Sequence, residues 1–173
     1  MATTLLPFTP FADDIRLWLL ALDRTPDAAA LERLKSGLST VFGTWRHKGQ
    51  DYAAAWLLLE DRLLAVAEPT MAGAPSGCAI DGMLRKVHRL AEELNLALVD
   101  PATQVLVRAQ DGLRTISKAE LGDRLADGTL DASTPVLDLS LFTLGALRSG
   151  QLEKPLHSTW IGRKFKVPVP VMN

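Results

Sequence analysis

Short continuous apolar runs alternate along the chain with stretches of helical spacing, and this alternation predicts the order of the elements. The run at 15–22 predicts a buried strand. Over 31–42 apolar residues recur three and four positions apart with charged residues between them, which indicates an amphipathic helix. We expect Thr25 to cap this helix, Pro26 to occupy its first position and Gly43 to end it.

The same two patterns continue through the next part of the chain. Apolar runs at 54–59 and 63–67 are separated by three charged residues, which predicts a hairpin. Helical spacing returns over 80–94, and the apolar stretch 96–99 predicts a strand after it. Two further runs within 104–116 are separated by Gln-Asp-Gly and predict a second hairpin.

The predicted order is therefore strand, helix, strand, strand, helix, strand. This order is typical of the ferredoxin-like split βαβ fold, an α+β architecture in which an antiparallel sheet carries both helices on one face. The region after 116 is less regular, with a capping-box pattern predicting a short helix at 117–125 and an apolar run predicting a strand at 136–139. We expect one domain over 1–173, with a core at 12–116 and a C-terminal elaboration at 117–173.

The last residues, from Phe165 onward, alternate proline with valine. Proline cannot donate to a sheet ladder, so this tail is expected to be extended or to form an edge strand. A strand added to the sheet of a second copy would make the protein a homo-oligomer.

Composition excludes several classes of protein. Hydrophobic residues make up 47% of the chain and charged residues 23%, which excludes intrinsic disorder. The formal net charge of -1 provides no excess of positive charge for a phosphate backbone, so we expect no nucleic acid partner. The apolar runs are too short to cross a membrane. A single cysteine and an N-terminus without a signal-peptide pattern favour a soluble cytoplasmic protein.

The residues that usually hold metals and nucleotides do not occur at the required spacings. One cysteine and three histidines form neither a CxxC pair nor an HExxH motif, and no GxxxxGK[ST] or GxGxxG motif is present. We therefore expect no metal and no cofactor.

Cys78 is the candidate nucleophile. It lies at the predicted start of the second helix, where the helix dipole lowers the pKa of a thiol, and His47 or His157 would serve as its base. The alternative is a cysteine packed as a small apolar residue, and we expect this alternative because Ala79 and Ile80 direct that turn toward the core. In that case Asp81 is a capping residue.

Candidate ligand-binding residues come from three polar segments. Trp45 and Trp160 lie in polar loops, where an indole either lines a pocket or covers the core beneath the loop. Ser76 and Gly77 belong to a glycine-rich stretch that either presents backbone N–H groups to an anion or simply caps the next helix. The remaining candidates are Asp81 and Ser158.

Three sequence stretches, Thr44-Trp45-Arg46-His47, Ser76-Gly77-Cys78-Ala79-Ile80-Asp81 and Ser158-Thr159-Trp160, resemble those of a group of small uncharacterised bacterial proteins. That family has a Trp-x-x-His or similar loop after its first helix, a Ser-Gly-Cys-Ser-Ile-Asp stretch at its second and a Ser-Trp near its C-terminus. Here Ala79 replaces the second serine, and His47 is one residue closer to Trp45. Some members are labelled ABC transporter ATPase, a label that a chain without a phosphate-loop motif does not support.

The hypothesis that these observations favour is a binding module for a small molecule or a protein. The site would form where the loops carrying Trp45, Cys78 and Trp160 converge. A cysteine-dependent enzyme with Cys78 as nucleophile and His47 as base is the alternative. A third hypothesis is a structural protein that self-associates through its tail.

Overall fold

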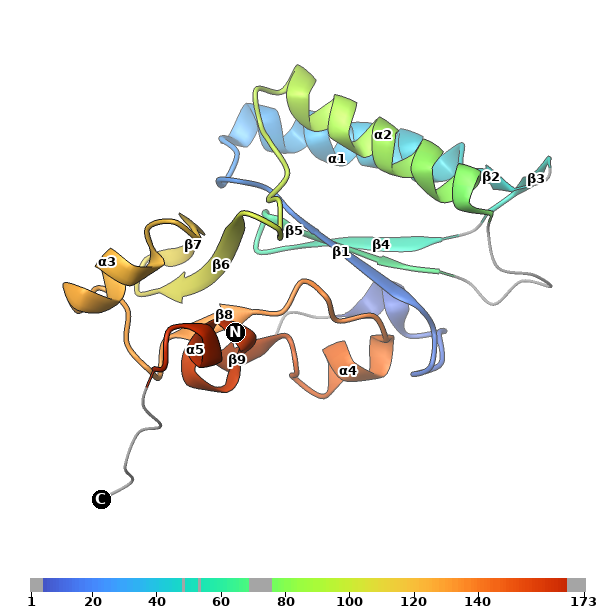
Figure 1. Cartoon of the computed structure of the whole chain (residues 1–173). Helices are drawn as coiled ribbons and strands as arrows, with labels where there is room; N and C mark the ends of the chain where they lie inside the picture. Colours follow the sequence, from blue (N-terminus) through green and yellow to red (C-terminus); the bar gives the residue numbers. More distant parts are fainter. Residues whose placement is uncertain (1–4, 48, 53, 69–75, 168–173) are drawn as a thin grey trace. The chain divides into compact units, whose positions relative to one another are not determined.

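The chain adopts an α+β fold in a computed structural model that describes residues 5–47, 49–52, 54–68 and 76–167 (Figure 1). It divides into two compact units. The first comprises Met1–Leu98 and Ser140–Ser149, and the second comprises Val99–Leu139 and Gly150–Asn173. The predicted core at 12–116 and elaboration at 117–173 do not follow this division, because the second hairpin belongs to the second unit and a later segment returns to the first.

The first unit contains a three-stranded antiparallel sheet. β1 (Leu17–Ala21), β5 (Leu63–Ala67) and β4 (Ala55–Leu59) lie side by side in that order. The predicted hairpin is confirmed, and its tight turn places Glu60 and Asp61 at positive φ. A shorter antiparallel pair, β2 (Arg46–His47) and β3 (Gln50–Asp51), precedes β4.

Both long helices cover one face of this sheet, as predicted (Figure 1). α1 (Ala28–Gly43) begins at Asp27, whose carboxylate accepts a hydrogen bond from the Ala30 N–H at 2.8 Å, so the expectation that Thr25 caps the helix is wrong. α2 (Gly77–Glu93) has Ser76 as its N-cap. The capping side chain in each case satisfies an N–H group of the first turn that has no partner within the helix.

The core of the first unit lies between the helices and this face of the sheet. Alternate strand residues point toward the helices, so that Trp18, Val66 and Trp56 form one cross-strand row. The buried helical residues that belong to the same core are Leu34, Leu38, Met83, Val87 and Ala91.

The segment 140–149 also belongs to the first unit. It runs beside residues 13–17, where the Leu17 N–H donates to Phe142 O at 2.8 Å and the Leu144 N–H donates to Ile15 O at 3.0 Å. α4 (Leu144–Arg148) follows, and Arg148 donates to the carbonyls of Phe8 and Phe11. The short helix η1 (Leu6–Phe8) contacts β4.

The predicted strand at 96–99 is reduced to a single bridge between Leu98 and Leu22. Leu96 and Val99 are nevertheless buried. The apolar stretch is therefore explained by side-chain packing rather than by a ladder of backbone hydrogen bonds.

The second unit is built on a four-stranded antiparallel sheet. Its strands are β7 (Gly112–Ser117), β6 (Gln104–Ala109), β8 (Pro135–Leu137) and β9 (Glu153–Pro155), in that order. α3 (Leu121–Ala126), η2 (Leu156–Ser158) and α5 (Trp160–Lys164) complete it. Its core consists mainly of Val105, Val107, Ile116, Leu121, Leu130, Val136, Leu156 and Ile161.

One expectation for this region needs correction, and most of another lies outside the described residues. The helix predicted at 117–125 begins only at Leu121, because Ser117 is still paired in β7. The segment before the tail is helical in α5, and Phe165 and Val167 pack against the core of the second unit. The rest of the proline-valine tail lies outside the described residues.

Candidate functional site

Trp45 covers the core and is not a pocket residue. Its side chain is 4% exposed and lies edge-on to Tyr52, with ring centroids 4.6 Å apart. The indole Nε1–H donates to Ala79 O at 3.1 Å. This hydrogen bond joins the loop after α1 to the first turn of α2, so the structure does bring two of the three predicted segments together.

The start of α2 is a solvent-facing surface. Ser76, Gly77, Cys78 and Asp81 are all exposed. The expectation that Cys78 packs against the core is wrong, because residues of the opposite face of the helix, such as Met83 and Val87, supply the buried contacts. The helix is capped by Ser76, which accepts from the Ala79 N–H at 3.3 Å, and not by Asp81.

The remaining predicted residues lie in the second unit or have side chains outside the described part of the structure. Ser158 and Trp160 belong to the second unit, where Ser158 Oγ donates to Pro155 O and Lys118 Nζ lies 4.4 Å from the Trp160 ring centroid. The Trp160 side chain is 45% exposed. His157, the other candidate base, places its ring Nδ1 2.9 Å from Ala132 O in the same unit. His47 belongs to β2, and its side chain is outside the described part of the structure.

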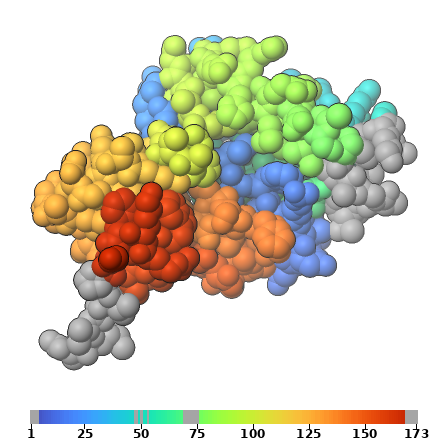
Figure 2. Space-filling model, in the orientation of Figure 1, coloured from blue at the N-terminus to red at the C-terminus, as the bar shows by residue number. Residues whose placement is uncertain are grey.

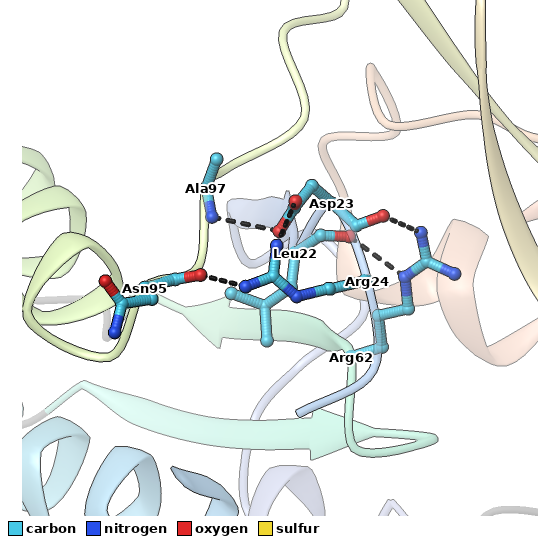
Figure 3. Close-up of polar contacts among 6 residues, drawn as sticks. All are labelled: Leu22, Asp23, Arg24, Arg62, Asn95 and Ala97. Carbon is cyan, nitrogen blue, oxygen red and sulfur yellow. Dashed lines mark hydrogen bonds and ion pairs between the residues drawn. The ribbon is translucent and has the colours of Figure 1, made fainter. Parts of the chain in front are cut away.

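A buried arginine organises one end of the first sheet (Figure 3). Arg62 is 3% exposed, and its guanidinium donates to Leu22 O at 2.9 Å and to Asp23 O at 2.5 Å. The carboxylate of Asp23 accepts from the Ala97 N–H at 2.9 Å, and Arg24 donates to Asn95 O. Burial lowers the pKa of Arg62, and the charge of Asp23 opposes this shift. The carbonyl acceptors are all backbone groups, which indicates a structural role.

A second buried charge, Glu68, lies just beyond β5. Its carboxylate is nearly inaccessible, accepts from Trp18 Nε1 at 3.1 Å and lies 3.8 Å from Arg16 Nε. The neighbouring Tyr52 hydroxyl is buried and has no hydrogen bond of ordinary geometry to the residues that the structure describes. Burial raises the pKa of Tyr52, and the interaction of the hydroxyl with the nearby Glu68 carboxylate, through hydrogen bonding and negative charge, raises it further.

The second unit contains a groove of about 710 Å³ that the sequence patterns did not indicate. Val107 of β6 and Arg114 of β7 are cross-strand partners, so both side chains leave the sheet on the same face and line the groove. Glu120 and Arg124, at α3, also line it, as do residues 129–131 and 133–135, which lead into β8. These residues are scattered over a long stretch of sequence and form no motif.

The groove carries charges of both signs. Arg114 forms an ion pair with Asp111 at 2.7 Å, which lowers the pKa of that carboxyl group. Asp131 accepts hydrogen bonds from the hydroxyl of Ser133 at 2.7 Å and from the Thr134 N–H at 2.8 Å, and these interactions lower its pKa as well. Asp131 therefore presents a fixed negative charge at neutral pH, while Arg124 is an exposed cation.

Two kinds of feature are absent from the described residues. They contain no group of three or more His, Cys, Asp or Glu side chains arranged to hold a metal ion. In the same residues no helix is long and apolar enough to cross a membrane. Comparisons with protein-family models, curated proteins and solved structures find no match to the chain.

Proposed function

We propose that this protein is a binding module whose site is the groove of the second unit. The observation that carries the proposal is the groove itself, because its volume of about 710 Å³ lies within the range of about 300–1,000 Å³ that is typical of small-molecule sites. Charged side chains of both signs line the groove beside the buried core residues Val107, Ile116 and Leu130. Such a surface combines contact area with polar groups that fix the orientation of a ligand.

The charges indicate the class of ligand. Arg124 and Arg114 would bind a carboxylate through charge-assisted hydrogen bonds, and Glu120 and Asp131 would bind an ammonium group. Arg114 and Asp131 are already held in place by their own neighbours, so binding orders few additional side chains. We infer a small zwitterionic ligand such as an amino acid or a short peptide.

The experiment titrates three probes into the full-length protein by isothermal calorimetry. L-Glutamate carries both charges, succinate only negative charges and putrescine only positive charges. We expect L-glutamate to bind more tightly than succinate and putrescine. Arg124→Gln and Glu120→Gln should each weaken glutamate binding about tenfold, because each removes one charged partner.

Arg163→Gln is the matched control. Arg163 is an exposed arginine of α5 in the same unit and does not line the groove, so this variant should bind glutamate as the wild type does. Equal affinity for all three probes, or binding that is unchanged in Arg124→Gln and Glu120→Gln, would refute the proposed site.

A cysteine-dependent enzyme is the alternative function, and the exposure of Cys78 favours it. Alkylation of the folded protein by iodoacetamide tests it, since a nucleophilic thiol reacts at neutral pH and loses this reactivity in His47→Ala. We further propose a cytoplasmic location and a ferredoxin-like core for the first unit. The order β1-β5-β4 with a bridge from Leu98 to Leu22, the residue after β1, supports such a core, with its last strand shortened.

A further inference from the structure

The outward face of α2 carries a hollow that the proposed function does not use. Gly82, Arg85, Lys86 and Arg89 line a depression of about 270 Å³ on this face. A Cβ added to Gly82 would meet no atom within 4 Å, so the space above the glycine is open. α2 forms part of the surface drawn in Figure 2, in green.

The spacing of these four residues has a specific meaning. They stand at positions i, i+3, i+4 and i+7 of one helix, which is the four-residue hole that receives one side chain of a facing helix in knobs-into-holes packing. The stems of Arg85, Lys86 and Arg89 are aliphatic, so the walls of the hollow are mainly carbon, with cationic groups at the ends of the stems. The hollow therefore suits an apolar side chain surrounded by acidic ones.

The three cations are available to a partner. Arg85, Lys86 and Arg89 are exposed, and none of them has a salt-bridge partner among the residues that the structure describes. A phosphate group would use the cations but would leave the carbon surface of the hollow in contact with a hydrated anion. A second copy of α2 is also a poor partner, because its outward face offers no apolar side chain larger than that of Cys78.

We propose that this face of α2 is a docking site for an acidic amphipathic helix of another protein. An apolar side chain of that helix enters the hollow above Gly82, and flanking glutamates or aspartates pair with Arg85, Lys86 and Arg89. Charge complementarity at the rim fixes the partner and the register, and the apolar contact at the centre excludes water.

The test uses a blocked, fluorescein-labelled peptide of three heptads, with leucine at the first position of each heptad and glutamate at the two flanking positions. Fluorescence anisotropy with the full-length protein should show binding that weakens as salt is added. Gly82→Leu places its side chain in the hollow, where its Cβ meets no atom within 4 Å, and should weaken binding about tenfold or more, because the leucine of the peptide can no longer enter.

A charge exchange makes the test specific. Lys86→Glu together with Arg89→Glu should abolish binding of the glutamate peptide and create binding of a peptide in which lysine replaces each glutamate. Arg33→Glu is the matched control, since Arg33 is an exposed arginine of α1 outside the hollow, and it should bind as the wild type does.

Three results would overturn the proposal. The first is equal binding of the glutamate and lysine peptides by the wild type, and the second is unchanged binding by a folded Gly82→Leu variant, with folding checked by circular dichroism. The third is self-association in the ultracentrifuge that disappears in Gly82→Leu, which would assign the face to a second copy of the chain.

Discussion

At the scale of single residues, the first unit contains two charged side chains that are almost completely buried. The guanidinium of Arg62 donates hydrogen bonds to backbone carbonyls just after β1, and Glu68 accepts a hydrogen bond from Trp18. A buried charge is costly unless such partners are present. The Tyr52 hydroxyl is the exception among the described side chains, since it is buried without a hydrogen bond of ordinary geometry and lies beside the carboxylate of Glu68.

Tyr52→Phe should therefore raise the free energy of unfolding by about 1 kcal/mol, because the variant removes the cost of burying an unpaired hydroxyl and keeps the ring that packs on Trp45. Urea denaturation measures the change. Glu68→Ala is the contrasting variant, expected to lower stability since Trp18 Nε1 loses its acceptor. A loss of stability in Tyr52→Phe would mean that the hydroxyl donates a hydrogen bond in solution, with the nearby Glu68 carboxylate as its acceptor.

At the scale of elements, the crossing of α1 and α2 depends on a residue without a side chain. A Cβ on Gly37 would lie 2.4 Å from Leu90 Cδ1 and 3.1 Å from Leu90 Cγ. Glycine costs about 1 kcal/mol in the interior of a helix compared with alanine. The close approach of Leu90 explains why this helix nevertheless contains one.

Gly37→Ala should lower the free energy of unfolding by about 1 kcal/mol, because the strain of moving Leu90, about 1–3 kcal/mol, exceeds the gain in helix propensity. In the Leu90→Ala background the same substitution should instead be stabilising. A double-mutant cycle by urea denaturation measures this coupling. A stabilising Gly37→Ala in the wild-type background would show that Leu90 moves aside at little cost.

The elements with strong periodicity were predictable, and those defined by distant contacts were not. The apolar spacing of α1 and the charged turn between β4 and β5 are local signals, and both elements are confirmed. β9, with the sequence Glu-Lys-Pro, has no apolar pattern, and only its pairing with β8 makes it a strand. Cys78 was misplaced because one residue at a helix start does not reveal which side of the helix it faces. The groove escaped prediction because its residues share a surface without sharing a sequence pattern.

At the scale of the whole molecule, the chain builds two units, each with its own core. Leu34 is a core residue of the first unit. Gly162 lies in the second, where an added Cβ would lie 2.4 Å from the backbone oxygen of Leu156. Backbone atoms cannot move aside as a flexible side chain can, so a side chain at Gly162 should destabilise the second unit. Truncation of Leu34 should destabilise the first unit, and the two substitutions therefore test the units separately.

Leu34→Ala should cost about 2–5 kcal/mol and raise amide hydrogen exchange mainly in the first unit, including 140–149. Gly162→Ala should raise exchange mainly in 99–139 and 150–167. Hydrogen–deuterium exchange followed by mass spectrometry measures both patterns. Exchange that rises equally over the whole chain in both variants would show that the two units unfold as one.

The return of 140–149 to the first unit has a consequence for protein synthesis. The three strands of the N-terminal sheet have been made once Ala67 is translated, but the contacts of Leu144 and the hydrogen bonds of Arg148 to Phe8 and Phe11 form only after 140–149 has been made. Residues 99–139 are translated in the interval. The apolar surface that 140–149 covers therefore stays exposed while residues 99–139 are being translated, and during that interval it is open to chaperones and to aggregation.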